Sequence, residues 1–144
     1  MNPTSRVDNE LKATRHITME ELLLDYCRDV TKSIEEPEVV AELLRRGADP
    51  SYYFQCAISL ACQSGYVQIV NMLLNDKRVD ARGHPKCRPL LSACKRGHIN
   101  VVRTLLGHCI WPRDMLQAAI SVAASASQDT KIAMLDMLER HMRR

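Results

Sequence analysis

Apolar residues recur at spacings of three and four from residue 18 onward, which is the pattern of amphipathic helices with one buried face. The first stripe consists of Met19, Leu22, Leu23, Tyr26, Cys27 and Val30. It follows Thr18-Met-Glu-Glu21, in which the threonine hydroxyl and the glutamate carboxylate can each satisfy a backbone amide at a helix start. A break is expected at 33–36. Pro37 then suits the first position of a second helix, and Gly47 suits the left-handed residue that ends it.

The same helix pair recurs further along the chain. Residues 61–74 (ACQSGYVQIVNMLL) align with residues 93–106 (ACKRGHINVVRTLL) at a constant offset of 32, from 61 to 93 and from 73 to 105. Repeats of this period are typical of solenoids, in which each helix pair buries its apolar face against its neighbours. The paired leucines are therefore expected to be mostly buried between layers. These are Leu43, Leu44, Leu73, Leu74, Leu105 and Leu106.

The repeated segments resemble the ankyrin-repeat family. Arg88-Pro-Leu-Leu-Ser-Ala-Cys-Lys-Arg-Gly-His98 is similar to the family's first helix, which reads roughly Thr-Pro-Leu-His-Leu-Ala-Ala-x-x-Gly-His. Glu38-Val-Val-Ala-Glu-Leu-Leu-Arg-Arg-Gly-Ala-Asp-Pro50 is similar to its second helix and the loop, or finger, that follows. The resemblance implies an all-α, ankyrin-type solenoid of about four helix pairs. Short β-turn fingers are expected at 49–55, 80–88 and 107–112.

This interpretation divides the chain into a polar N-terminal tail at 1–16 and one ankyrin-repeat domain at 17–144. The approximate repeats are 17–50, 51–80, 81–110 and 111–144. The last pair, helices at about 113–126 and 129–138, lacks the glycine and is expected to cap the stack.

The repeats depart from the family at two positions of the Thr-Pro-Leu-His motif. Cys56 and Ser59 replace its threonine and histidine in one repeat, and Arg88 and Leu91 replace them in the next. The hydrogen bonds that these two residues make between repeats in the family are therefore expected to be missing.

Composition supports a helical globular protein. The chain has 144 residues, of which 46% are hydrophobic, 26% are charged and only 4% are aromatic, and this scarcity of aromatics disfavours a β-sandwich or barrel. No apolar run approaches the roughly 18 residues of a membrane span, and the N-terminus does not resemble a secretory signal. We therefore expect an intracellular protein, cytoplasmic or nuclear, without a membrane partner.

Candidate catalytic groups are few. His98 lies four residues after Cys94, but both occupy positions that are structural in the family. The acidic pairs at 20–21 and 35–36 lie at helix starts, where the helix dipole favours negative charge. The sequence contains neither a glycine-rich phosphate loop nor a nucleophile elbow. No enzyme activity, cofactor or small-molecule substrate is expected.

Charge is unevenly distributed along the chain. Residues 77–113 contain nine Lys and Arg against Asp80 alone, for a net charge of +8, whereas residues 1–50 have a net charge of −4. Such asymmetry points to an acidic partner, with an ordinary solvated face as the alternative. A nucleic acid contacted at its phosphates by residues 77–113 is a further alternative, although this segment offers only Trp111 as an aromatic stacking platform.

In the ankyrin family, finger tips and the exposed side of each first helix form the binding surface. Carried over residue by residue, the resemblance implies a partner-binding set of Tyr52, Tyr53, Gln55, Gln63, Arg82, His84, Lys86, Arg88, Lys95 and Arg96. Tyrosine and arginine are enriched in binding hot spots. Trp111 is expected to pack on a helix start, with a role as a further anchor as the alternative. The expected function is a non-catalytic interaction module or accessory subunit that binds an acidic protein.

The six cysteines are expected to be reduced and metal-free, because the sequence contains no Cys-x-x-Cys pair. His84 and Cys87 are the nearest approach to the spacing of metal ligands, and they form only one loose pair. Thiol titration of the denatured, unreduced protein should return six free thiols, and elemental analysis should detect no zinc. Stoichiometric zinc would contradict this expectation and make His84 and Cys87 candidate ligands.

Overall fold

The computed structural model describes residues 2–13, 18–29, 37–85 and 88–143, without the side chains of Phe54 and Gln55. All regular elements in these ranges are helices, which confirms the all-α class. They are α1 (Pro3–Ala13), α2 (Met19–Arg28), α4 (Pro37–Arg45), α5 (Tyr52–Ser64), α6 (Val67–Leu74), α7 (Pro89–Arg96), α8 (Ile99–His108), α9 (Arg113–Ala123) and α10 (Gln128–Met142). Val30 and the break expected at 33–36 lie outside the described residues.

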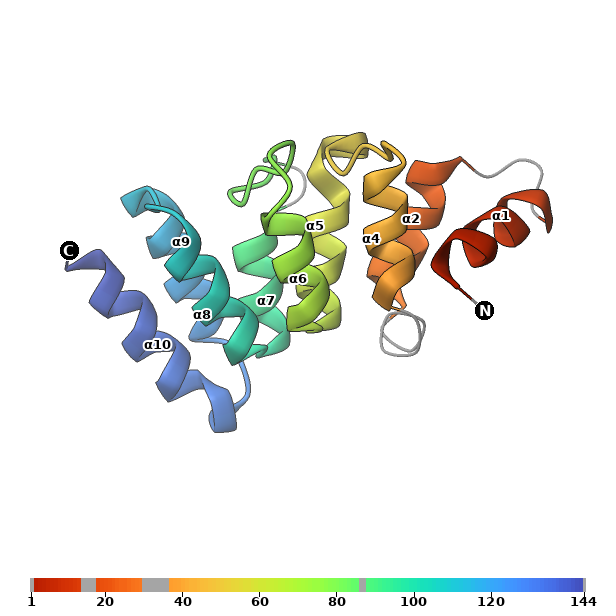
Figure 1. Cartoon of the computed structure of the whole chain (residues 1–144). Helices are drawn as coiled ribbons and strands as arrows, with labels where there is room; N and C mark the ends of the chain where they lie inside the picture. Colours follow the sequence, from red (N-terminus) through yellow and green to blue (C-terminus); the bar gives the residue numbers. More distant parts are fainter. Residues whose placement is uncertain (1, 14–17, 30–36, 86–87, 144) are drawn as a thin grey trace.

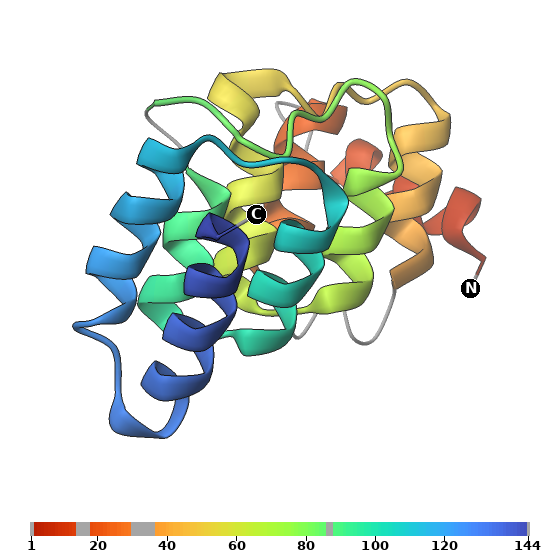
Figure 2. The ribbon, with the colours of Figure 1, turned by 90° about the vertical axis from the view of Figure 1, so that its left-hand side faces the viewer.

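The helices stack in two rows from one end of the molecule to the other (Figure 1). The inner row consists of α2, α5, α7 and α9, each in contact with the next. The outer row consists of α4, α6, α8 and α10, again in contact in this order. The loops between successive pairs all lie on the same side of the stack (Figure 2). This arrangement is the solenoid of helix pairs that the repeat predicts.

In the described part of the chain the fingers are residues 46–51, residues 75–85 with Arg88, and residues 109–112, and the first and third are shorter than expected. The prediction of a finger at 49–55 is wrong from Tyr52 onward, because α5 begins there. The carboxylate of Asp49 accepts hydrogen bonds from the Ser51 N–H at 2.9 Å and from its hydroxyl at 2.6 Å, which closes a tight turn just before the helix. Gly107 and His108, expected in the third finger, belong to α8.

Helix ends follow the local signals in the sequence. Thr18 Oγ1 accepts a hydrogen bond from the Glu21 N–H at 3.1 Å, as expected of the N-cap of α2. Gly65 and Gly97 end α5 and α7 in the left-handed conformation, with φ of +78° and +73°. A Cβ at Gly65 would lie 2.5 Å from the imidazole of His98, so the glycine also lets the next repeat approach closely.

Hydrogen bonds between repeats are present, although the family's threonine and histidine are replaced. His98 Nε2 lies 2.9 Å from the carbonyl oxygen of Gln63 in the preceding repeat. The hydroxyls of Ser59 and Ser92 are 3.2 Å apart, and Ser64 donates to the Cys27 carbonyl at 2.8 Å. The expected loss of inter-repeat bonding is therefore compensated by serines and by His98.

The core is a continuous layer of aliphatic side chains between the two rows. Five of the six paired leucines are buried, whereas Leu44 is half-buried. The valines one turn earlier, such as Val70 and Val102, are fully buried. Trp111 is only 6% exposed, as expected of a packed residue, but it donates its indole N–H to the Leu105 carbonyl at 2.8 Å, near the end of α8 and not at a helix start.

The polar N-terminal tail expected at 1–16 is, over residues 3–13, a helix (α1) that packs on α4. Val7 is its one fully buried residue, so hydrophobic periodicity gives little signal there. Polar contacts hold the helix instead: Arg46 bonds Asp8 at 2.8 Å, and Thr4 donates to Glu42 at 3.2 Å. The Arg46 guanidinium also bonds Glu42, at 2.9 Å.

Replacing Leu105 by alanine should lower the free energy of unfolding by about 2–5 kcal/mol, because the fully buried side chain would leave a cavity between layers. Leu44→Ala is the matched control, since Leu44 is only half-buried. Urea denaturation of both variants measures the two losses. Equal losses would contradict the layered core described above.

The contact between α1 and α4 is expected to make a pH-dependent contribution to the free energy of unfolding. Hydrogen bonds from Arg45 and Arg46 lower the pKa of Glu42 to about 2, from an ordinary value of 4.5. Because the folded-state pKa is lowered, this stabilisation is complete above pH 4.5 and is lost as pH falls towards 2. Glu42→Gln should therefore lower Tm at pH 7, and its difference from wild type should shrink on acidification.

Glu38→Gln is the control for this measurement, because Glu38 is an exposed glutamate on the same helix. Its Tm should follow that of wild type at each pH. A Glu42→Gln deficit that stays constant between pH 7 and pH 2 would contradict a role for the ionised carboxylate.

Candidate interaction surface

The inner row presents three cations on α7. Arg88 is the N-cap of the helix, and Lys95 lies on the same face because seven residues complete nearly two turns. Arg96 lies one position further on, and all three residues are exposed. None of the three side chains forms an ion pair or a hydrogen bond with any residue of the described ranges. Their charges are therefore available to a partner.

The neighbouring inner helix, α5, begins with two exposed tyrosines. Tyr52 is 42% exposed and Tyr53 is 63% exposed, and their ring centroids are 6.3 Å apart. Tyr53 has φ of +55°, the one positive φ of a non-glycine residue in the described ranges, a conformation that costs about 1–3 kcal/mol. Gln63 is exposed in the last turn of α5.

The second finger contributes a small hollow beside this face. It encloses about 230 Å³ and lies between the finger and the start of α9. Its lining includes Arg82, His84 and Arg88, together with Asp114 and Met115 from α9. The structure thus brings three of the predicted residues to one place. Lys86 and the side chain of Gln55 lie outside the described residues.

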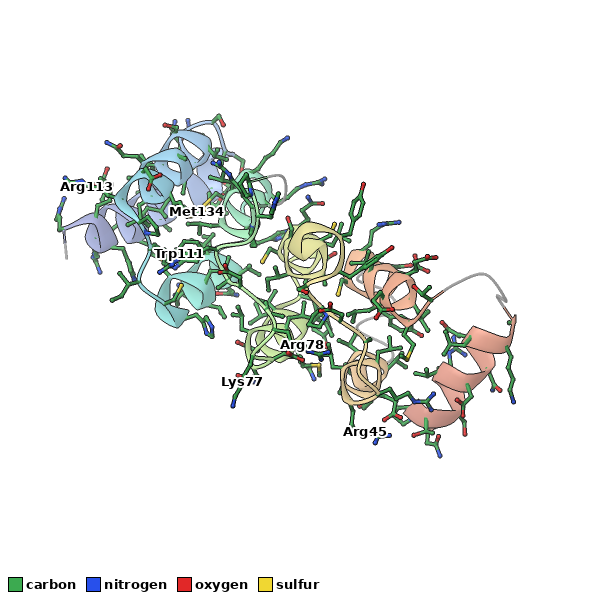
Figure 3. The ribbon with its side chains drawn as sticks, turned by 90° about the horizontal axis from the view of Figure 1, so that it is seen from above. Arg45, Lys77, Arg78, Trp111, Arg113 and Met134 are labelled. Carbon is green, nitrogen blue, oxygen red and sulfur yellow. The ribbon has the colours of Figure 1, made fainter. Side chains whose placement is uncertain are left out.

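Two cations of residues 77–113, which we call the basic segment, bond to other parts of the protein in a way that the sequence did not predict. Arg82 donates from Nη2 to the Ile110 carbonyl at 2.8 Å, which joins the second finger to the third. Arg78 pairs with Asp76 at 2.7 Å and lowers the pKa of that carboxyl. Its guanidinium also reaches the Leu44 and Gly47 carbonyls at 3.4 Å, and Figure 3 shows it pointing towards α4. The net charge of the segment therefore overstates the cations that a partner can reach.

The candidate residues of α5 and those of α7 lie side by side. Helices α5 and α7 are in contact, and they run in the same direction along the inner row. Tyr52 and Tyr53 therefore lie at the same end as Arg88, whereas Gln63 lies at the same end as Lys95. We call the set Tyr52, Tyr53, Gln63, Arg82, His84, Arg88, Lys95 and Arg96 the inner surface.

The chemistry of the thiols disfavours nucleophilic catalysis by Cys94. Burial raises the pKa of this thiol to about 12, so it remains protonated at neutral pH. The nearby His98 is engaged with the Gln63 carbonyl. Among the described residues, no group of three His, Cys, Asp or Glu side chains is placed to hold a metal ion.

Helices in the described part of the chain are all too short or too polar to cross a membrane.

Comparison with known proteins places these features in a family. The family model for ankyrin repeats (three copies) matches residues 30–114 and 58–135. The chain is 34% identical over 53 residues to the ankyrin repeat and KH domain-containing protein mask of Drosophila melanogaster. It is 35% identical over 68 residues to the ankyrin repeat and KH domain-containing protein mask-1 of Caenorhabditis elegans.

The aligned parts cover 35% and 46% of this chain but only 1% and 2% of those two proteins. No solved structure matches the chain. The two family-model matches overlap and extend over most of the stacked helix pairs. The chain belongs to the ankyrin-repeat family.

Proposed function

We propose that this protein is a non-catalytic interaction module that binds an acidic surface or peptide of another protein through the inner surface. Ankyrin repeats generally mediate protein–protein interaction, and solenoids of this kind use extended concave surfaces for it. The observation that carries the proposal is the trio Arg88, Lys95 and Arg96, exposed on one short helix without a partner in the described ranges.

The cations and the tyrosines of the inner surface have different roles in this proposal. Cations at an interface chiefly raise the association rate and select partners of opposite charge. Tyr52 and Tyr53 offer apolar area with few rotatable bonds and supply more of the affinity. Backbone strain such as that at Tyr53 is found most often at binding and catalytic sites, which supports this assignment.

The hollow beside Arg88 fits a single carboxylate of the partner. Arg88 supplies a guanidinium group, which binds carboxylates well, whereas the Arg82 guanidinium at the same hollow already donates to the Ile110 carbonyl and Asp114 adds a negative charge. Trp111, the one aromatic residue of residues 77–113, is only 6% exposed, which is too little for its ring face to stack on a base. The burial of Trp111 favours an acidic protein over a nucleic acid.

The location of the partner is part of the proposal. Burial raises the pKa of the Cys27 thiol to about 12 and also raises that of Cys62, as expected for cysteines that act as small hydrophobic residues. The reduced state expected for such cysteines suits the cytoplasm or the nucleus. We therefore place the interaction inside the cell.

The proposal predicts that reversing two charges slows binding without unfolding the protein. The probes are peptides selected by the wild-type protein from a random phage-displayed library, in which acidic sequences should be enriched. Lys95→Glu with Arg96→Glu should reduce the association rate of these peptides about tenfold at low salt and flatten its salt dependence. Tyr53→Ala should mainly raise the dissociation rate. Surface plasmon resonance measures both rates.

The matched control is Lys12→Glu with Arg103→Glu, which changes the net charge equally at two exposed positions on α1 and α8. It should bind like wild type. Unchanged binding by the Lys95/Arg96 reversal at low salt would refute the inner surface as the binding site. Binding of random duplex DNA or RNA that this reversal abolishes, with a steep salt dependence, would establish the nucleic-acid alternative instead.

A further inference from the structure

A second hollow lies at the C-terminal end of the stack, and we call it the end cavity. It is formed by the end of α8, the third finger, the start of α9 and the last turn of α10. It encloses about 720 Å³, which is within the range of ligand-binding pockets. It shares no lining residue with the hollow beside Arg88, so it belongs to a different surface.

The apolar part of the end cavity is rigid. Trp111 is held by the hydrogen bond from its indole N–H to the Leu105 carbonyl, and Leu116 is 3% exposed. Ile110 also lines the cavity and is 87% exposed, although its backbone carbonyl is fixed by the bond from Arg82. A large aliphatic side chain is therefore presented to solvent next to a preformed apolar wall.

The backbone around this cavity has unused hydrogen-bonding groups. The chain leaves α8 extended at Cys109, with φ of −151° and ψ of 171°, and this helix end has no capping N–H bond. The carbonyls of Leu106, Gly107 and His108 accept no hydrogen bond from the described residues. The N–H groups of Cys109 and Ile110 likewise donate none within those ranges. An extended chain offers the complementary groups at every residue.

The permanent charge in the lining of the end cavity is the cation of Arg113. Its lining contains Arg113, His108 and His141 but no aspartate or glutamate. The side chain of Arg113 points away from the stack in Figure 3, and it forms no ion pair or hydrogen bond with any described residue. A carboxylate is the group that best complements an exposed arginine of this kind.

We propose that the end cavity binds an extended acidic–apolar peptide segment of a partner protein. An apolar side chain of the segment packs against Ile110 and Trp111, a carboxylate pairs with Arg113, and the peptide backbone bonds the end of α8 and the third finger. A fatty acid would supply a carboxylate and an apolar chain, but it lacks the N–H donors that the three carbonyls complement. This site is independent of the inner surface.

The test uses the full chain and a random peptide library displayed on phage. Phage are first depleted on the Ile110→Asp variant and then selected on wild type, so that only peptides that need the end cavity are enriched. These peptides should combine Asp or Glu with large apolar residues. Fluorescence polarisation should show Kd raised about tenfold or more by Ile110→Ala and by Arg113→Glu.

Two controls separate this site from the rest of the molecule. Ile132→Ala removes an isoleucine on α10 that is also highly exposed, at 74%, and should leave Kd unchanged. The Lys95/Arg96 reversal should also leave Kd unchanged. The end-cavity proposal and the inner-surface proposal can therefore fail independently of each other. Because Ile110, Arg113 and Ile132 are all exposed, these variants should keep the wild-type Tm.

The proposal is overturned if no peptide is enriched, or if Ile132→Ala weakens binding as much as Ile110→Ala does. It is also overturned if sedimentation shows a dimer that Ile110→Ala dissociates, because a second copy of the chain would then cover the cavity. Preferential binding of dodecanoate to wild type over Arg113→Glu, without peptide binding, would make the occupant a fatty acid instead.

Discussion

Close contact between successive helix pairs is the constraint on which the rest of this structure depends. Each pair has an apolar face that only its neighbours can cover, and the fully buried Val70, Leu73, Val102 and Leu105 form that layer. The contact is close because Gly65 leaves room for the imidazole of His98, which bonds the preceding repeat. Polar bonding between repeats is thus supplied by His98 and by serines, including Ser59 at the histidine position of the family motif, and the stack tolerates replacement of the usual threonine and histidine.

The two ends of the stack are finished in different ways. At the N-terminal end, α1 covers α4 mainly through ionic contacts, with Arg46 bridging Asp8 and Glu42. At the C-terminal end, α10 packs on α8 and α9 with Met134 and Leu138 fully buried. The ionic contacts of α1 should weaken at low pH, when the carboxylates become protonated. The burial of aliphatic side chains on α10 does not depend on pH. The end cavity lies where the last turn of α10 meets the third finger.

The fold leaves some cations unpaired and uses others internally, and this division shapes the functional proposals. Arg78 and Arg82 hold fingers in place through backbone carbonyls and therefore contribute to the rigidity of the surface. Arg88, Lys95 and Arg96 have no such role and are exposed on an inner helix. A rigid scaffold that presents unpaired charges loses little conformational entropy when it binds a partner. Arg113 is also exposed and has no ion pair or hydrogen bond from its side chain to a described residue, but it lies at the end cavity. Two separate binding surfaces are therefore proposed.

The sequence by itself determined the helix pairs, their order and most of the core. Hydrophobic periodicity, the 32-residue offset and the glycines at 65 and 97 are local signals, and each reports a requirement of the backbone or of one helix face. Only the tertiary structure decided that residues 3–13 form a docked helix, that Tyr52 belongs to α5, and that Arg82 is tied to Ile110. It also decided where Trp111, Arg113 and Met142 meet around one cavity. These features depend on contacts between residues far apart in the chain or on polar pairs, and neither leaves a periodic pattern in the sequence.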